Sequence, residues 1–233
     1  MNLAIVGYGK MGKLIEQLAA EYGFTVRLKL DEYNNAGFEG ITRENFADID
    51  VATEFSMPSA AAENIERISS LGVNLVVGST GWLGEMARVR SAVARYGTGL
   101  VWSPNFSIGV NVFFRLAAEA ARLLRAEENF DAWGWEIHHA AKKDAPSGTL
   151  LKLVETMKQA GYARRIDVAS SRAGAHPGTH EVGFDSLAET ITLRHTARSR
   201  EGFARGALKA AQWLVGKKGF FEFSELFFSE PRA

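Results

Sequence analysis

A strand, a glycine-rich loop and a helix follow one another at the start of this chain, and no other segment limits its fold as strongly. The segment is IVGYGKMGKLIEQL, and its glycines at 7, 9 and 12 have the spacing G-x-G-x-x-G. A short apolar run precedes the glycines directly, and apolar residues at helical spacing follow them. This order is typical of a parallel sheet whose first turn binds the phosphates of a dinucleotide.

The three glycines have distinct expected roles in such a turn. Gly7 permits the tight turn, Gly9 lets the backbone approach a pyrophosphate, and Gly12 lets the helix pack closely on the strand. Asp31 lies at the end of the second predicted strand, where a carboxylate bonds ribose hydroxyls. An ordinary glycine turn is the alternative, but the context favours a dinucleotide site. Its predicted contacts are Gly7, Tyr8, Gly9, Lys10, Met11, Gly12 and Asp31.

The charges near this turn bear on the choice of nicotinamide coenzyme. Asp31 and the adjacent Glu32 would repel a 2′-phosphate, so we expect a mild preference for NADH over NADPH. Lys10 in the glycine loop, and Arg27 or Lys29 on the second strand, carry charges that attract such a phosphate. Use of both coenzymes therefore stays open.

Strand and helix patterns alternate through the first hundred residues. Short apolar runs predict strands at 3–6, 25–30, 50–55, 74–77 and 100–102, with helix-period segments such as MGKLIEQLAAEYG and PSAAAENIERISSLG between them. These two helices run to Gly23 and Gly72, the residue type that commonly follows a helix. The alternation predicts a parallel sheet with right-handed crossovers, so we expect residues 1–106 to form a Rossmann-like α/β domain.

The pattern changes after residue 106. Helices are predicted at 109–125 and 149–160, and strands at 133–138, 165–170, 181–185 and 190–195. Consecutive strands with short links predict a mixed, open sheet, and hence a smaller α+β domain over residues 107–203. A last amphipathic helix stops at Gly216 and leads to the aromatic tail FFEFSELFF. We expect this tail to be buried, either against the first domain or in a subunit contact.

The composition excludes several classes of partner and chemistry. Of the 233 residues 46% are hydrophobic and 23% charged, and 27 basic residues balance 27 acidic ones. A net charge of zero gives no bulk attraction to nucleic acid or to a membrane surface. No signal peptide or long apolar span is recognisable, so we expect a cytoplasmic protein. Because cysteine is absent, disulfides and thiolate chemistry are excluded.

Two loops at predicted strand ends are rich in turn-forming residues. GSTGW follows the strand at 74–77, and SPNFSIG follows the strand at 100–102. Carboxyl ends of parallel strands share one edge of a sheet, so both loops are placed to hold the nicotinamide end of a coenzyme. Ordinary turn chemistry explains the same composition equally well. The cofactor contacts predicted at these strand ends, and at the end of the third strand, are Phe55, Ser56, Gly78, Ser79, Thr80, Gly81, Ser103, Pro104, Asn105 and Phe106.

The densest group of chemically active residues is EIHHAAKKDAPSGT, at 136–149. Pro146 favours a turn, and Ser147 is a good N-cap for the helix that follows. The backbone N–H groups of Gly148 and Thr149, with the hydroxyls of Ser147 and Thr149, then form an anion site at the positive end of that helix. A carboxylate would fit there.

Three titratable side chains precede this turn. His138 and His139 end a strand, so their side chains point to opposite faces and do not form a paired metal site. One can act as an acid while the other contacts substrate or packs, and Lys142 adds a positive charge or a second acid. Each is more often structural when it occurs alone, and only their concentration favours function. No metal site is evident, because a Pro-Gly turn separates His176 from His180.

The segment E-x-H-H-x-x-K-x-D-A-P-S-G-T closely resembles the signature of the 4-hydroxy-tetrahydrodipicolinate reductase (dihydrodipicolinate reductase) family, which belongs to the diaminopimelate and lysine pathway. Other segments resemble the same family along nearly the whole chain. In chain order they are EFSMPS, GSTGW, SPNFSIGVNVFF, RAGAHPGTHEVGF and HTARSREGFARGALKAAQWLVGKKG. Each is a modest signal alone, but together and in this order they are very specific.

The resemblance implies roles for the matching positions. His138 resembles the catalytic histidine, Lys142 its lysine partner in proton donation and carboxylate binding, and His139 a substrate contact. Ser147, Gly148 and Thr149 resemble the carboxylate-binding turn, and the glycine loop, Asp31 and the two strand-end loops resemble the cofactor positions. The implied reaction is the NADH- or NADPH-dependent reduction of a small cyclic dicarboxylate, with hydride delivered to ring C4 and protonation of the resulting enamine.

The resemblance also implies an assembly, and the chain departs from the family in places. Residues 204–233 would return to the cofactor domain, and the substrate domains would meet in a homotetramer. The glycine loop is one residue shorter than in many relatives, Ala141 replaces a polar residue or His of some members, and little chain separates Asp31 from Asp50. Two alternatives remain: another dehydrogenase of similar fold acting on aspartate or homoserine, and a non-catalytic, nicotinamide-responsive regulator.

Overall fold

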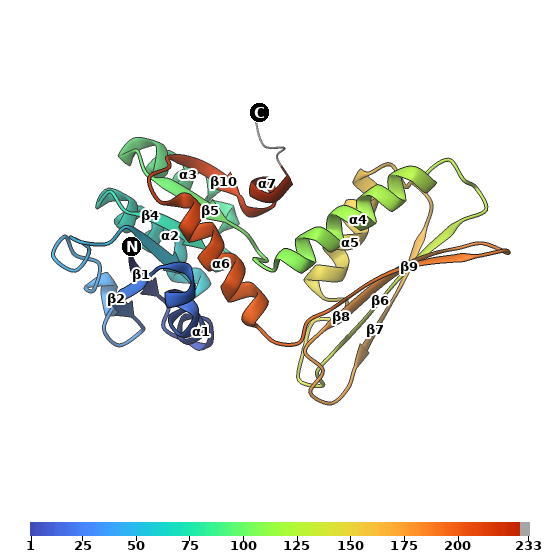
Figure 1. The fold of residues 1–233 in the computed structure, drawn as a ribbon, viewed down its shortest axis with the longest axis horizontal. Helices are drawn as coiled ribbons and strands as arrows, with labels where there is room; N and C mark the ends of the chain where they lie inside the picture. The colour runs from blue at the N-terminus through green and yellow to red at the C-terminus, as the bar shows by residue number, and fades with distance from the viewer. Residues whose placement is uncertain (229–233) are drawn as a thin grey trace. The chain divides into compact units, whose positions relative to one another are not determined.

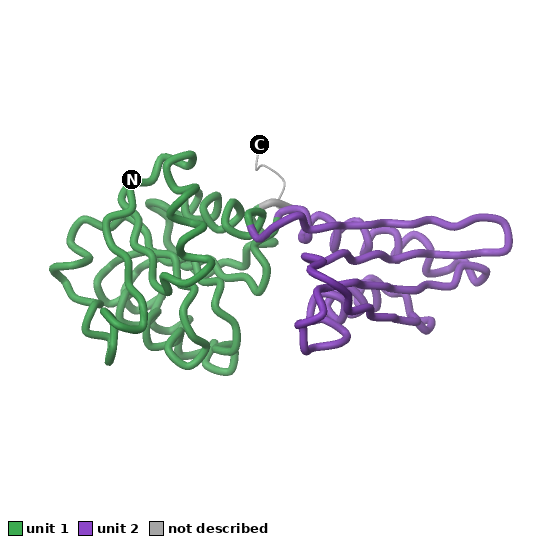
Figure 2. The backbone as a smooth tube through the Cα atoms, turned by 90° about the horizontal axis from the view of Figure 1, so that it is seen from below, with its two compact units in different colours: residues 1–107, 201–233 green, residues 108–200 purple. Residues whose placement is uncertain are grey.

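The computed structural model describes residues 1–228. The chain divides into two compact units, shown in different colours in Figure 2. Unit 1 comprises residues 1–107 together with the chain from residue 201 onward, and unit 2 comprises residues 108–200. Within the described residues, no helix is both long enough and apolar enough to cross a membrane.

Unit 1 is built on a six-stranded parallel sheet whose order is β10-β5-β4-β3-β1-β2. The strands are β1 (Asn2–Val6), β2 (Thr25–Leu30), β3 (Val51–Glu54), β4 (Asn74–Val77), β5 (Gly99–Trp102) and β10 (Gly219–Glu222). Strand β1 lies between β2 and β3, so the chain leaves it in one direction and returns on its other side. Ligands of open α/β sheets bind at such a switch point. The predicted fold class is confirmed, and the five strands predicted before residue 106 are all present.

Helices cover both faces of this sheet (Figure 1). They are α1 (Lys10–Ala19), α2 (Pro58–Ser70), α3 (Met86–Tyr96) and α6 (Glu201–Leu214), with short 3-10 turns at Ala20–Tyr22, Ala36–Phe38 and Leu83–Glu85. Ile65 of α2 and Val93 of α3 share a core with alternate strand residues such as Ala52. The intervening strand residues are buried on the other face, where α1 packs on α6. Gly23 and Gly72 follow their helices with positive φ values of 73° and 82°, as predicted.

The aromatic tail returns to unit 1. Strand β10 pairs with β5, and the short helix α7 (Phe223–Phe228) follows it (Figure 1). The Phe221 ring lies 5.1 Å from that of Trp213, and the fully buried Phe223 ring lies 4.8 Å from that of Phe106. For these residues the structure selects burial against the first domain over a subunit contact. The sequence interpretation did not predict that the tail begins as a sixth strand.

Unit 2 is a four-stranded mixed sheet with two helices on one face. Its order is β7-β6-β8-β9, with β6 and β7 parallel and the other two pairs antiparallel. Leu150 and Met157 of α5 and Ala117 of α4 form its core with Phe184 of the sheet. The elements are α4 (Ile108–Leu124), β6 (Asp131–His138), α5 (Gly148–Gln159), β7 (Ile166–Arg172), β8 (Thr179–Asp185) and β9 (Thr190–Thr196). The predicted mixed sheet is confirmed.

Two glycines of helix α6 provide a matched test of the packing in unit 1. A Cβ on Gly206 would lie 1.7 Å from the backbone oxygen of Phe106, whereas a Cβ on Gly202 would meet its nearest atom, Ser107 Oγ, at 3.6 Å. Gly206→Ala should therefore destabilise the protein by roughly 3 kcal/mol or more, because backbone must move. Gly202→Ala should be neutral or stabilising by up to about 1 kcal/mol. Urea unfolding of both variants measures the difference, and equal stabilities would contradict this packing.

Candidate active site

A cavity of about 770 Å³ opens at the switch point of the unit 1 sheet. The loop after β1, the end of β2 and the loop after β3 form most of its wall. Six predicted cofactor contacts belong to the lining: Gly7, Tyr8, Gly9, Asp31, Phe55 and Ser56. The lining also includes residues that the sequence analysis did not assign to the site, among them Lys13, Tyr33, Phe38 and Asn64.

The three glycines of the loop fit the roles expected of them. Gly7 has a φ of 95°, and a Cβ there would lie 2.4 Å from the carbonyl group of Phe55. A Cβ on Gly12 would lie 2.6 Å from the oxygen of Gly7, so only glycine lets helix α1 approach the strand this closely. A Cβ on Gly9 would have no neighbouring atom within 4 Å, and no side chain caps the helix that Gly9 precedes. These features fit the pyrophosphate of a dinucleotide, which needs close backbone approach and free N–H groups.

The other predicted cofactor residues lie outside the lining of this cavity. Lys10, Met11 and Gly12 form the first turn of α1. The two later loops are nevertheless packed against the cavity wall. A Cβ on Gly78 would lie 2.0 Å from the Phe55 ring, and the Phe106 ring is 6.0 Å from it. The hydroxyl of Ser79 donates to the carbonyl of Ser56. The remaining residues of these loops, which are Thr80, Gly81, Ser103, Pro104 and Asn105, lie in the same two segments.

Acidic side chains line the cavity at the end of β2. Asp31 and Glu32 both belong to the lining, and Oδ1 of Asp31 accepts hydrogen bonds from the backbone N–H groups of the next turn. Lys29 is ion-paired with Glu16 at 3.0 Å, and the guanidinium of Arg27 donates to Asn2. Both basic side chains of β2 that the sequence analysis offered to a phosphate therefore have other partners.

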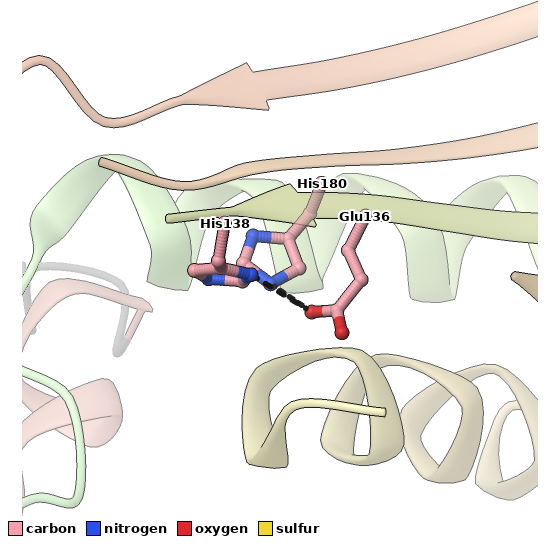
Figure 3. Close-up of side chains that lie close together, drawn as sticks. All are labelled: Glu136, His138 and His180. Carbon is pink, nitrogen blue, oxygen red and sulfur yellow. Dashed lines mark ion pairs between the residues drawn. The ribbon is translucent and has the colours of Figure 1, made fainter. Parts of the chain in front are cut away.

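In unit 2, strand register gathers charged residues around the end of β6. Glu136 and His138 are two residues apart and share the buried face of the strand. Glu136 pairs with His180 of β8, and His138 pairs with Arg172 of β7. Figure 3 shows the side chains of Glu136, His138 and His180 gathered at this point. Sheet pairing thus assembles a polar cluster that no single segment contains.

Glu136 is the centre of this cluster. Its side chain is fully buried, and Oε1 accepts three hydrogen bonds: 2.8 Å from the N–H of Ser147, 2.9 Å from Ser170 Oγ and 2.8 Å from Arg172 Nη2. Burial alone would raise the pKa of this carboxyl, but the bonds from Ser147, Arg172 and Ser170 lower it to about 2. Glu136 is therefore ionised at neutral pH despite its burial.

Two histidines face the other oxygen of this carboxylate. Oε2 lies 3.3 Å from His138 Nδ1 and 3.3 Å from His180 Nε2 (Figure 3). Burial lowers the pKa of both rings, and with the charge of His138 it lowers that of His180 to about 4. Both rings are accordingly mainly neutral at pH 7, and each presents one nitrogen to an ionised carboxylate.

The turn before helix α5 has the expected cap. Ser147 Oγ accepts a hydrogen bond from the N–H of Leu150 at 3.2 Å, which confirms Ser147 as the N-cap. The same hydroxyl lies 3.1 Å from His180 Nε2, so the cap is tied to the cluster. Gly148 is exposed and Thr149 is half-buried in the first turn that follows. The positive end of α5 thus lies beside Glu136 and the histidines, and the carboxylate of Asp144 interacts with the backbone N–H of Gly148.

The remaining predicted residues lie outside these contacts. Lys142 Nζ bonds both carboxylate oxygens of Asp144, at 2.7 Å and 2.8 Å. His139 is half-buried just past the end of β6, and its carbonyl accepts from the N–H of Lys142. The structure thus joins His138 and Ser147 through Glu136, and it leaves Lys142 and His139 on the adjoining loop.

Sequence analysis missed Glu136, Arg172 and His180 as members of the site. Glu136 had a readable signal, because it precedes His138 by two residues on a strand and must share its face. Arg172 and His180 enter only through strand register, which the sequence does not give. Ligand atoms of Glu136, His138 and His180 lie within 4.8 Å of one another, a spacing that a metal ion could bridge. Arg172 already provides a positive charge to the same carboxylate.

Known proteins match this chain over nearly its whole length. The family model described as dihydrodipicolinate reductase, N-terminus, matches residues 1–106, and the model of its C-terminus matches residues 109–227. A 4-hydroxy-tetrahydrodipicolinate reductase of Christiangramia forsetii is 35% identical over 97% of each chain. One from Thermosipho africanus is 34% identical, also over 97% of each chain. A dipicolinate-bound dihydrodipicolinate reductase from Paenisporosarcina sp. TG-14 has the same fold, with a TM-score of 0.78, 19% identity and coverage of 97% and 99% of the two chains.

The buried histidines predict how stability depends on pH. The pKa of His180 falls from 6.5 to about 4 on folding, so the unfolded chain takes up a proton below pH 6.5 that the folded protein refuses. The free energy of unfolding should therefore decrease as pH falls from 6.5 toward 4, with His180 contributing on the order of 1–3 kcal/mol. His180→Gln should reduce this slope, measured by urea unfolding at a series of pH values. An unchanged slope would show that His180 is not held neutral.

Proposed function

This chain belongs to the dihydrodipicolinate reductase family, and on that premise we propose that it reduces 4-hydroxy-tetrahydrodipicolinate to tetrahydrodipicolinate with a nicotinamide coenzyme. It is an NAD(P)H-dependent oxidoreductase of the diaminopimelate and lysine pathway. One observation carries the proposal. The family match covers both units, and each unit contains a site of the required kind: a glycine-lined cavity in unit 1 and a titratable cluster beside a helix N-terminus in unit 2.

The residues of unit 1 bind and orient the coenzyme. Gly7, Gly9 and the N-terminus of α1 hold the pyrophosphate, and Asp31 accepts hydrogen bonds from a ribose. The loops at 78–81 and 103–106, which pack against Phe55, hold the nicotinamide ring. When bound, the coenzyme supplies a hydride to C4 of the unsaturated ring that the substrate forms by losing water.

The residues of unit 2 bind the dicarboxylate and deliver a proton. The N–H groups of Gly148 and Thr149 and the hydroxyl of Thr149 bind one carboxylate at the positive end of α5, and Ser147, whose N–H bonds Glu136, holds this turn in place. Lys142 exchanges Asp144 for a substrate carboxylate, and His139 forms a further substrate contact. After hydride addition the ring is an enamine, and His138 donates a proton to the neighbouring ring carbon, which completes the reduction. Substrate carboxylates raise the proton affinity of His138 at the moment when it must carry a proton.

The proposed coenzyme preference is for NADH. Asp31 and Glu32 line the cavity where a 2′-phosphate would lie, and their charges oppose it. The ion pair of Lys29 with Glu16 supports the same preference, because it compensates the lysine charge. Lys13, which belongs to the cavity lining, attracts a phosphate and therefore allows weaker binding of NADPH.

Assembly and location complete the proposal. We propose a homotetramer that forms through unit 2, where Val168 of β7 and Ile191 of β9 expose 43% and 41% of their surface on the outer strands of the sheet. Exposed apolar side chains of this kind are typical of contacts between subunits. The proposed location is the cytoplasm.

The reaction is tested by mixing the purified protein with the cyclic substrate, generated in place by the preceding synthase, and following the absorbance of NADH. The wild-type protein should oxidise the coenzyme rapidly. His138→Gln should lower kcat by about 10²- to 10⁴-fold with little change in coenzyme affinity, because it removes only the proton donor. Lys142→Ala should also abolish rapid turnover.

Lys152→Ala is the matched control for the lysine variant, because Lys152 is exposed on α5 and pairs with Glu155. It should retain wild-type turnover. Measurable coenzyme binding without oxidation of the cyclic substrate would contradict the proposed reaction, and oxidation or reduction of an aspartate or homoserine substrate would replace it.

Coenzyme preference is tested separately with Asp31→Asn, which keeps an oxygen for the N–H groups of the turn but removes the charge. The wild-type protein should have the higher kcat/KM with NADH, and the variant should shift the NADPH-to-NADH ratio upward by about tenfold, or about 1.4 kcal/mol. Glu44→Gln, an exposed acid outside the cavity lining, is the control and should leave the ratio unchanged. An unchanged ratio in Asp31→Asn would exclude Asp31 as its determinant.

A further inference from the structure

The surroundings of His138, the proposed proton donor, disfavour its protonated form. His138 is 9% exposed, and burial lowers the pKa of its ring, so the group that must carry a proton loses it more easily than in water. A donor of this kind needs a fixed negative charge beside the ring nitrogen that does not face the substrate. The following inference rests on the proposed function, because it assigns a partner to His138.

We propose that Glu136 is the positioning residue of His138. Its carboxylate holds a proton on Nδ1 and stabilises the imidazolium, so that Nε2 is the nitrogen that donates to the substrate. The carboxylate also fixes the anion-binding turn through the N–H of Ser147, so one buried charge positions both the proton donor and the carboxylate site.

The two oxygens of Glu136 divide these tasks. Oε1 accepts three hydrogen bonds, from Ser147, Ser170 and Arg172, which fix the carboxylate in place. Oε2 is buried and makes no hydrogen bond within the described chain, and the same is true of His138 Nδ1. These two atoms are 3.3 Å apart. A buried carboxylate oxygen and a buried ring nitrogen that face each other without other partners are an incomplete pair, which a small rotation of the ring completes.

His180 does not compete for this role, although its Nε2 is equally close to Oε2. Ser147 Oγ lies 3.1 Å from the same nitrogen, so Nε2 of His180 has a second polar partner besides Oε2, whereas the buried Nδ1 of His138 has none within the described chain. His180 is also the more strongly buried ring, and its low pKa keeps it neutral. The charge of Glu136 therefore acts on His138.

The opposite nitrogen of His138 is kept uncovered by a glycine. A Cβ on Gly178, directly before β8, would lie 2.9 Å from Nε2 and 3.0 Å from the neighbouring ring carbon. Any side chain at this position would cover Nε2. The ring thus has a carboxylate on its Nδ1 side, and position 178 places no side chain over its Nε2 side.

Other charged groups around His138 also shift the pKa of its ring. Arg172 on β7 and Lys142 on the loop after β6 lower its pKa, and Asp144 on that loop raises it. His180 on β8 is neutral. Removing Glu136 or Arg172 should therefore move the titration of His138 in opposite directions, which general loosening of the site would not do.

The test is a titration of the His138 ring by NMR in the full-length protein without substrate. The signal is identified among five histidines by its absence in His138→Gln. Glu136→Gln keeps an oxygen for the three donors but removes the charge, and should lower the pKa of His138 by about one unit or more. Arg172→Gln should raise it by roughly half a unit. Glu119→Gln, an exposed acid paired with Arg122 on α4, is the control and should leave it unchanged.

Kinetics provide the second readout. Activity should fall with rising pH as His138 loses its proton, and this alkaline limb of kcat should move to lower pH in Glu136→Gln and to higher pH in Arg172→Gln. Glu136→Gln should recover turnover at acid pH, while its KM for the coenzyme stays as in the wild type. If Glu136→Gln does not fold, the upward shift in Arg172→Gln still decides the question.

Each outcome separates this inference from the proposed function. One outcome is that the wild-type protein turns over substrate, His138→Gln does so far more slowly, and the pKa of His138 is unchanged in Glu136→Gln and Arg172→Gln. This outcome would overturn the role of Glu136 but would support the proposed reaction. Absence of wild-type turnover would overturn the reaction. In that case the NMR shifts would still show whether Glu136 holds the proton on His138.

Discussion

The site in unit 2 depends on one buried negative charge. An ionised carboxylate inside a sheet is unfavourable unless it is paired and hydrogen-bonded, and Glu136 meets this condition with Arg172 and two further donors. Those donors come from two segments that are distant in the sequence: Ser170 and Arg172 lie on strand β7, and Ser147 lies in the turn before α5. Removing the charge would leave Arg172 without its partner, so the site and the packing of the unit share this interaction.

Unit 1 depends on close backbone approach rather than on charge. Gly12 lets helix α1 lie against the turn at Gly7, and Gly206 lets helix α6 lie against the backbone of Phe106. Phe106 in turn contacts both Phe55 at the cavity wall and Phe223 of the tail. The aromatic tail therefore supports the loops that hold the nicotinamide ring in the proposed function, although it lies far from them in the sequence.

Local signals determined which parts of the structure were predictable. The glycine loop, the cap at Ser147 and most strands each depend on a few neighbouring residues, and all were predicted. Helix α3 was given no range, although its buried residues Val89, Ala92 and Val93 have helical spacing. Strand β10 was missed because its identity depends on pairing with β5, more than a hundred residues earlier. The same limit hid His180 and Arg172, which reach His138 only through the register of sheet B.

Comparison of two buried glutamates explains why the cluster in unit 2 has an electrostatic role. Glu54 ends β3 and is as inaccessible to solvent as Glu136, and it too bonds a neighbouring turn, through Ser56 and Asn64. Deeper burial raises the pKa of Glu54 despite its neutral donors, whereas the hydrogen bonds from Ser147 and Arg172 lower that of Glu136 to about 2. The same side chain therefore favours a proton deep in unit 1 and a charge at the end of β6 in unit 2. Only the charged one can hold a proton on a neighbouring histidine, and it is the one that has a histidine beside it.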